Sequence, residues 1–386
     1  MDIHTDLNDE FACIGNACRR NCCQGWSISL DSETTAYYNS LEDDFGEFIK
    51  SHMEPTEGGG SKFSLKKGEK CPAQREDGLC DIYIKYGENR LSKTCTEFPR
   101  YNLEINGNNR FRYLSNECEE VLRNLYDREK NLEVIIEAAD KKDIEKNADL
   151  LDFLQLIAWC VDYIQDESVP LWNALTTTIH IAIEASRAFL EGDEKKFSRV
   201  TEAIPTISET YYQAITGFPE DVLMEVAWRK VRLISVAYLD FLDLTDFKVF
   251  EDMFPVPEKY STDSSERGEQ VRKAYDVFSS TITASDMRFY RRFFANMLLP
   301  YAFDLLEDNP SDVFLYEFVP RVITTITVPS LWSDKDLKDR HEFFSKLAML
   351  QRMSKRAYFS RLSEMIKEQM TCDLTEYAIM LASLLR

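Results

Sequence analysis

Apolar side chains recur at helical spacing through most of the chain from about residue 145 onward. The stretch from Ala148 to Gln165 predicts a mostly buried helix. Pro170 suits the first turn of a second helix, which we expect to run to about Leu190 before Gly192 breaks it. Further helices are predicted over residues 194–203, 206–215, 219–243, 266–281, 284–306, 311–325, 335–368 (with an interruption) and 373–385. This part of the chain is therefore predicted to be all-α.

The first 125 residues have a different texture, with brief helical periods and frequent turn residues. One regular feature is clear. The alternating segments 101–105 and 110–114 flank Asn106-Gly107, and Asn-Gly between such segments is a strong β-hairpin signal. The predicted hairpin carries the chain from Cys95 back to Cys118 and brings these two distant cysteines near each other.

These patterns predict a mainly α protein. A small, irregular, cysteine-rich and metal-binding N-terminal domain with a β-hairpin occupies residues 1–125, and an all-α helical domain follows at 126–386. The clearest linker runs from Phe254 to Gly268, so the helical domain is either subdivided near residues 255–268 or forms one bundle. A hydrophobic content of 44% over 386 residues is ample for buried cores.

The formal net charge of −21 argues against nucleic-acid binding, which needs a surplus of Lys and Arg on one surface. The start of the chain is acidic where a signal peptide needs a basic region, and no stretch reaches the ~18 apolar residues of a membrane span. We therefore expect a cytoplasmic protein with no membrane partner.

Ten cysteines are present, and eight of them fall before residue 120. The first four lie within eleven residues of one another. In a reducing compartment, thiols at this density indicate a soft metal rather than disulfides. The predicted metal ligands are Cys13, Cys18, Cys22, Cys23, Cys71, Cys80, Cys95 and Cys118. Cys160 and Cys372 are expected to be packing residues.

The arrangement around these cysteines resembles that of the bacterial cysteine-cluster proteins described as zinc- or iron-chelating, and within them the flagellin lysine N-methylases. The likeness is carried by a compact cysteine group followed by Gly and Trp, then Cys-Pro, Gly-Leu-Cys-x-Ile and Cys-x-x-Phe-Pro-Arg. The matching residues outside the eight cysteines are Gly25, Trp26, Asp31, Pro72, Gly78, Leu79, Ile82, Leu91, Ser92, Phe98, Pro99 and Arg100. A looser likeness covers an aromatic helix at residues 290–296 that precedes Leu299-Pro300.

The resemblance implies an enzyme that transfers methyl groups from S-adenosylmethionine to lysines of flagellin and carries an iron-sulfur cluster in its N-terminal domain. A 4Fe-4S cluster needs four thiolates and tolerates irregular spacing, with zinc as the alternative metal. Because eight candidates exceed four positions, some serve as structural thiols or hold a second metal. We rank Cys18, Cys22, Cys80 and Cys95 slightly ahead.

The usual signatures of a methyl-donor site are missing from the sequence. There is neither a Gly-x-Gly-x-x-Gly loop nor the C-x3-C-x2-C spacing of radical S-adenosylmethionine enzymes. We expect the donor to bind between the two domains. There Arg291, Arg292 and Asn296 hold its carboxylate, and Tyr290 or Trp26 stacks on its adenine.

No motif identifies a catalytic residue. Glu97, Tyr101 and Glu317 are candidates for accepting a proton from the lysine. No Ser-His-Asp arrangement, phosphate loop or HExxH sequence supports a hydrolase or a nucleotide triphosphatase. The alternative function is a non-enzymatic zinc- or iron-binding interaction protein, or a redox sensor that uses its thiols or cluster.

Overall fold

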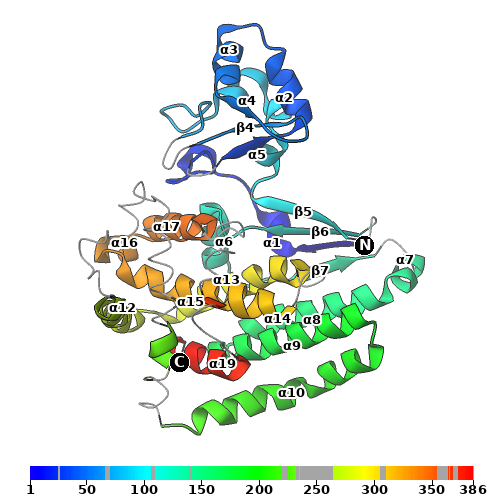
Figure 1. Cartoon of the computed structure of the whole chain (residues 1–386), viewed down its shortest axis with the longest axis vertical. Coiled ribbons are helices and arrows are strands. Elements are labelled where there is room, and N and C mark those ends of the chain that lie inside the picture. Colours follow the sequence, from blue (N-terminus) through cyan, green and yellow to red (C-terminus); the bar gives the residue numbers. More distant parts are fainter. Residues whose placement is uncertain are drawn as a thin grey trace.

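A computed structural model of the chain describes residues 1–24, 27–65, 70–105, 109–138, 141–219, 225, 227–231, 234, 264–304, 310–353, 364, 366–367 and 373–385. Figure 1 shows a small lobe standing on a larger, mainly helical body. We call residues 12–97 the cysteine lobe and the remaining residues the main body. The boundary between them follows the hydrophobic packing, because the two parts have separate clusters of buried side chains.

A four-stranded sheet lies in the main body next to the cysteine lobe (Figure 1). Its order is β5-β6-β1-β7. The predicted hairpin is confirmed as β5 (Arg100–Ile105) and β6 (Asn109–Leu114), which pair in antiparallel register, although its turn lies outside the described residues. The sequence pattern missed β1 (Asp2–Thr5) and β7 (Val134–Glu137), because each is short and gains its strand partners only from distant parts of the chain.

Helices form the rest of the main body, and the helix predicted for Ala148 to Gln165 is confirmed as α8. In Figure 1, α8, α9 and α10 lie one below another, with α9 between its neighbours. Helix α9 packs on both α8 and α10. Outside the segment from Pro310 to Leu331, the helices that the structure describes in the main body are α1 (Asp6–Glu10), α6 (Glu119–Asp127), α7 (Lys141–Lys146), α8 (Ala148–Gln165), α9 (Leu171–Glu191), α10 (Glu194–Thr216), α12 (Ser264–Ser279), α13 (Ala284–Asp304), α16 (Asp334–Lys338), α17 (Arg340–Met353) and α19 (Leu374–Leu384).

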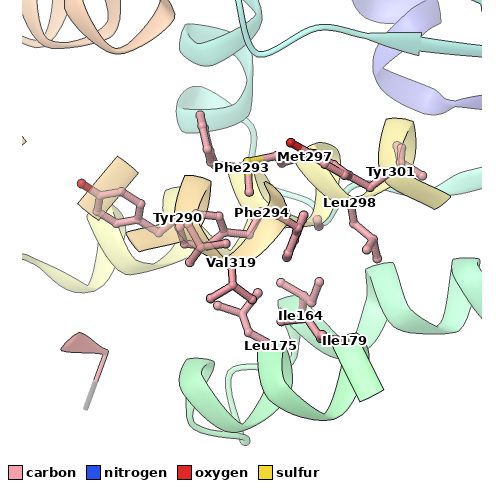
Figure 2. Close-up of a cluster of buried hydrophobic side chains, with 14 of the residues drawn as sticks. Ile164, Leu175, Ile179, Tyr290, Phe293, Phe294, Met297, Leu298, Tyr301 and Val319 are labelled. Carbon is pink, nitrogen blue, oxygen red and sulfur yellow. The ribbon is translucent and has the colours of Figure 1, made fainter. Parts of the chain in front are cut away.

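Helix α13 runs through the centre of the main-body core. Figure 2 shows its aromatic and aliphatic side chains meeting Ile164 of α8 and Leu175 and Ile179 of α9. Phe293 and Phe294 are fully buried there. Burial of large apolar side chains, at about 25 cal/mol per Å², is the main stabilising term in such a core. Because α13 packs on both β6 and α8, it connects the sheet to the helical layers.

Two of the helix predictions were wrong. The helices expected at 194–203 and 206–215 form one helix, α10, which contains Pro205. A proline removes a single backbone hydrogen bond, and packing of α10 along α9 compensates for this loss. The helix predicted over 284–306 is confirmed as α13, which continues past Pro300 to Asp304. The helix expected at 311–325 is a series of short pieces: α14 (Pro310–Val313), the π-helix η5 (Phe314–Phe318), α15 (Val319–Thr327) and the 3₁₀ helix η6 (Val328–Leu331).

The cysteine lobe is more regular than the sequence predicts. A three-stranded antiparallel sheet has the order β2-β4-β3, with Ile28 opposite Phe63. The elements described in the lobe are η1 (Gly15–Ala17), β2 (Ile28–Leu30), α2 (Ser32–Asn39), α3 (Asp44–Ser51), β3 (Met53–Pro55), β4 (Ser61–Phe63), α4 (Asp81–Tyr86), η2 (Glu88–Arg90) and α5 (Lys93–Glu97). The lobe core is small and includes Tyr38 and Cys71. A core of this size leaves little stability in reserve.

The hydrophobic clusters do not follow the predicted domain boundary at residue 125. Ile3, Phe111 and Leu125 belong to the same cluster as the helices of the main body. The independence of the two predicted domains stays a prediction. The linker expected at 254–268 lies largely outside the described residues. Among the described helices, none is both long enough and apolar enough to cross a bilayer.

Candidate functional site

Several of the predicted metal ligands lie at the N-termini of helices. Cys80 is the N-cap of α4, Cys118 is the N-cap of α6, and Cys95 lies in the first turn of α5. Burial raises the pKa of both capping thiols, and the backbone N–H groups of residues 82 and 83 beside Cys80, and of residues 120 and 121 beside Cys118, oppose this rise. A helix N-terminus stabilises negative charge. These helix ends therefore offset part of the cost of forming a thiolate, the form in which cysteine binds a metal.

Backbone pairing brings the other cysteines of the lobe to the same place. The N–H of Cys71 donates to the carbonyl oxygen of Cys23 over 2.8 Å, so the two cysteine-bearing loops run side by side. An isolated bridge joins Gln74 to Cys80, and the N–H of Asp81 donates to the carbonyl of Ala73 over 2.8 Å. Segments that are up to about fifty residues apart in sequence thus converge on one side of the lobe core.

The thiols influence one another electrostatically in two overlapping groups. Burial, with smaller contributions from Cys95 and Cys80, raises the pKa of Cys71 to about 12. Burial likewise raises the pKa of Cys95 to about 11, with Cys22 and Cys80 contributing. The second group brings Cys18 close to three other sulfurs and raises its pKa, mainly through burial. The two groups share Cys22. The first comprises Cys22, Cys23, Cys71, Cys80 and Cys95, and the second comprises Cys13, Cys18, Cys22 and Cys118.

The adjacent pair Cys22 and Cys23 is coupled. Cys23 donates a hydrogen bond to the sulfur of Cys22, which lowers the pKa of Cys22 and raises that of Cys23. Arg352 of α17 also lowers the pKa of Cys22, and to a smaller degree opposes the burial that raises the pKa of Cys118 to about 11. Buried thiolates that repel one another need a positive charge nearby. The donor set therefore fits a metal centre that deprotonates several thiols together.

The spacing of the sulfurs bears on the kind of metal centre. Four thiolates on one zinc at about 2.3 Å would lie about 3.8 Å apart. Over the described ranges, which include all eight cysteines, no three of these sulfurs lie within 4.8 Å of one another. Asp2, His4 and Glu137 do approach this closely on the main-body sheet, but Arg110 and Arg112 already neutralise Asp2. In an iron-sulfur cluster each thiolate binds a different iron, so wider sulfur spacing suits a cluster better than a single zinc.

Asp31, one of the residues that carry the family likeness, orients the helix that bears Cys95. Its carboxylate accepts hydrogen bonds from the N–H and hydroxyl of Thr34 over 2.9 and 2.8 Å and from the N–H of Lys93 over 2.9 Å. Although burial favours the neutral acid, these bonds outweigh it and hold the pKa of Asp31 at about 2. Ser92 then caps α5 by accepting the N–H of Cys95 over 3.2 Å. Asp31 thus fixes where α5 begins.

Arginines hold the cysteine-bearing loops against the main body. Nη1 of Arg352 donates to the carbonyl of Asn21 over 2.8 Å, and its Nε donates to the carbonyl of Glu117 over 2.7 Å. One side chain of α17 therefore contacts the loop before Cys22 and the loop before Cys118. Arg20 adds an ion pair with Glu342 at 2.8 Å.

The residues predicted to bind the methyl donor lie on α13, apart from Trp26, which is outside the described residues. Arg291 is 5% exposed, and its two Nη atoms donate to the carbonyls of Ile164 and Val169 over 2.9 and 2.6 Å. Arg292 is 4% exposed and donates to the carbonyl of Leu125 over 3.1 Å. These carbonyls lie at or just beyond the C-termini of α8 and α6, where helices leave acceptors unpaired. The structure thus shows both guanidinium groups capping helices, while their predicted role in donor binding stays a prediction.

Tyr290 and Asn296, the other two predicted donor-binding residues, have different surroundings. Tyr290 is buried in the core, and its hydroxyl has no hydrogen-bond partner in the described part of the chain (Figure 2). Asn296 lies two turns further along α13 and lines a cavity of about 410 Å³. Two of the predicted proton acceptors, Tyr101 and Glu317, line the same cavity. Glu97 instead lies on α5, 3.8 Å from Lys93.

The sequence analysis missed two charged residues of this cavity, Glu117 and Arg321. Glu117 directly precedes Cys118, so proximity to a predicted ligand was an available signal. No motif surrounds Arg321, which reaches the cavity because the π-helix η5, which leads directly into α15, packs beside α13. The prediction that Cys160 is a packing residue is confirmed by its burial in the main-body core, while Cys372 lies outside the described residues.

Comparison with known proteins finds partial matches. A protein named lysine-N-methylase from Salmonella typhimurium (strain LT2) is 36% identical to this chain over 96 residues, which are 23% of this chain and 24% of that protein. A lysine-N-methylase of Salmonella choleraesuis gives the same values. A protein named flagellar biosynthetic protein FliU from Salmonella muenchen is 34% identical over 96 residues, which are 23% of this chain and 56% of that protein.

The chain thus spans about a quarter of the length of the two methylases that it matches. Neither a protein-family profile nor a solved structure matches it. The partial and distant likeness suggests the family of lysine N-methylases that the sequence pattern already resembled.

Proposed function

We propose that this protein is a lysine N-methyltransferase that modifies flagellin. The observation that carries the proposal is the 36% identity over 96 residues with proteins named lysine-N-methylase, together with the name of the flagellar relative. The cysteine arrangement that carries the family likeness is compatible with it, because those cysteines converge in space. The methyl donor is S-adenosylmethionine, whose sulfonium group supplies an electrophilic methyl group.

The chemistry asks for a lysine amine that has lost its proton and lies in line with the methyl group. The nitrogen lone pair forms the new N–C bond, the C–S bond breaks, and its electron pair stays on sulfur. A proton leaves the lysine either before or after transfer. A shielded pocket lowers the lysine pKa and favours the reactive neutral amine. Glu117 and Glu317 line a cavity of the main body, and their carboxylates are the chain's candidates for receiving the proton. Tyr101 lines the same cavity, but burial raises the pKa of its phenol and keeps it protonated.

We further propose that the converging thiols hold a 4Fe-4S cluster. Cys22, Cys80 and Cys95, three of the four residues that we ranked first, lie in one thiol group, and Cys18 lies in the other. The cluster would supply positive charge that keeps buried thiolates ionised. It would also join loops that the small lobe core holds only weakly. The backbone N–H groups at the helix N-termini lower the pKa of Cys80 and Cys118 against the effect of burial, which supports thiolate ligation once a metal is present.

Anaerobic purification followed by iron, sulfide and zinc analysis tests the metal, and labelled S-adenosylmethionine offered with flagellin from the same organism tests the activity. We expect iron with sulfide, broad absorption near ~400 nm, and label on flagellin lysines. A flagellin whose lysines have been chemically acetylated is the control and should take up no label. Zinc alone with no transferred label would contradict the methyltransferase and favour a metal-stabilised interaction protein. Colour without donor binding would favour a redox sensor.

A further inference from the structure

The cavity beside Asn296 lies where five parts of the main body meet, and we call it the Asn296 cavity. It holds about 410 Å³, a volume within the range of small-molecule sites. Hairpin strands, the loop before Cys118, α13, the π-helix with α15, and α17 each contribute to it. Its lining consists of Tyr101, Tyr113, Leu114, Ser115, Asn116, Glu117, Asn296, Met297, Pro300, Tyr301, Glu317, Arg321 and Gln351.

The amide of Asn296 has a fixed orientation. Its Nδ2 donates to the carbonyl of Leu114 over 2.8 Å and to Oδ1 of Asn116 over 2.6 Å. Asn116 is oriented in turn, because its own Nδ2 donates to the carbonyl of Phe293 over 3.0 Å. A flipped Asn296 would set its carbonyl oxygen against two acceptors. The Nδ2 group of Asn296 is therefore fully used, and its carbonyl oxygen Oδ1 is left to accept a hydrogen bond. This oxygen is buried without a partner within the described residues.

A buried acceptor without a partner costs about 1–3 kcal/mol, so a native protein retains one where a ligand or water satisfies it. Asn296 is 1% exposed, which puts this acceptor out of reach of bulk solvent. The Nδ2 group of Asn296 already donates two hydrogen bonds, so a ligand that contacts Oδ1 must bring a hydrogen-bond donor. An ammonium group is the donor that suits it best.

Charged groups of both signs line the cavity. Glu117 and Glu317 contribute carboxylates, and Arg321 contributes a guanidinium. Glu317 belongs to the π-helix η5, a form of turn that is frequent at functional sites. Arg321 follows four residues later, and its guanidinium carbon lies 5.5 Å from the centre of the Tyr301 ring. Tyr301 and Met297 come from the same face of α13 (Figure 2).

This layout separates ligand classes by charge. A plain alkylammonium ion would use the carboxylates and Asn296 but would leave Arg321 as an unfavourable neighbour. An anion such as phosphate would use Arg321 but would be repelled by two carboxylates. A molecule with an ammonium and a carboxylate on one carbon satisfies both signs. Apolar surface from Met297, Pro300 and Tyr301 then accommodates a short side chain.

We propose that the Asn296 cavity binds the zwitterionic head of an α-amino acid. Its carboxylate pairs with Arg321, and its ammonium group is held by Glu317 and Oδ1 of Asn296. The identity of the ligand rests on the proposed function: in a methyltransferase the molecule with such a head is the methyl donor, whose methionine end has this form. The charge recognition itself does not depend on methyl transfer.

The test is calorimetric titration of the full chain with L-methionine, S-adenosylhomocysteine and n-butylamine. We expect the first two to bind and n-butylamine to compete weakly. Arg321→Gln and Glu317→Gln should each weaken both amino-acid ligands about tenfold or more, the usual loss when one partner of a charged hydrogen bond is removed. Arg288→Gln, on an exposed part of the same α13, is the matched control and should leave both affinities unchanged.

Truncated ligands guard against variants that are merely unfolded. L-methioninol lacks the carboxylate, so its affinity should not respond to Arg321→Gln. 3-(Methylthio)propionate lacks the ammonium group, so its affinity should not respond to Glu317→Gln. Equal losses for all ligands in both variants would overturn the assignment, as would tight binding of n-butylamine alone or no binding of any probe. L-methionine binding with this pattern but no methyl transfer would uphold the cavity and remove the proposed function. Methyl transfer that survives both substitutions would uphold the proposed function and would remove the cavity as the binding site of the methyl donor.

Discussion

Arg291 is predicted to stabilise the fold, and replacing it with methionine tests this directly. Arg291 is 5% exposed, and its guanidinium donates to two carbonyls, one at the end of α8 and one in the loop that follows. Methionine fills a similar volume but donates no hydrogen bond. Each bond from a charged donor contributes about 1.5–3 kcal/mol. Because water reaches one of the two carbonyls more easily, we expect Arg291→Met to lower the free energy of unfolding by about 3 kcal/mol.

Urea unfolding followed by tryptophan fluorescence measures this change. Arg288→Met is the matched control, because Arg288 lies on the same helix, its side chain is 40% exposed, and its pairing with Glu167 at 3.8 Å is a surface contact. Such pairs contribute about 0–1 kcal/mol. If Arg291→Met kept wild-type stability but lost affinity for S-adenosylhomocysteine, Arg291 would be a donor-binding residue and the helix-capping explanation would be refuted.

Three further predictions concern the cysteine lobe. Cys80→Ser should lower the iron content of anaerobically purified protein, whereas Cys160→Ala, a change in the main-body core, should leave the iron-to-protein ratio unchanged; equal ratios in both variants would remove Cys80 from the ligand set. Because the pKa of Asp31 is held at about 2 in the folded protein, below the ordinary value of about 3.9, its stabilising effect is complete above about pH 4 and is lost as the pH falls toward 2. Asp31→Asn should flatten this part of the unfolding-midpoint-against-pH curve, and an unchanged slope would contradict it. Tyr38→Phe removes the hydroxyl that donates to the carbonyl of Arg90 over 2.7 Å, so the lobe should lose about 1 kcal/mol of stability in urea, and no loss would mean that water replaces the bond.

Patterns within short stretches of sequence predicted the elements that are stabilised by residues close together in the chain. Helix α8 begins and ends where its apolar period does, and the β5–β6 hairpin surrounds the Asn-Gly pair that predicts it. Cysteine density also marked the region that the structure folds around a thiol group. Each of these rests on residues adjacent in sequence, which propensity and spacing describe well.

The elements that sequence reasoning missed depend on distant partners. Strand β1 is only four residues long and exists because β6 and β7, more than a hundred residues away, pair with it. Pro205 predicts a break that packing on α9 overrides. The role of Arg291 also depends on the fold. The sequence shows only a basic residue, whereas the structure shows its guanidinium donating to a carbonyl at the end of a helix.

The sequence by itself determined that this protein is mainly helical, that its cysteines gather near the N-terminus and that its charge is acidic, because composition and periodicity record these properties directly. Tertiary structure alone decided which cysteines face one another, which arginines cap helices and that Glu117, Asn296, Glu317 and Arg321 share one cavity. The physical reason is that charge pairing and cavity shape depend on distances in space. Residues nearly two hundred positions apart, such as Asn116 and Asn296, come within hydrogen-bonding distance only when the chain has folded.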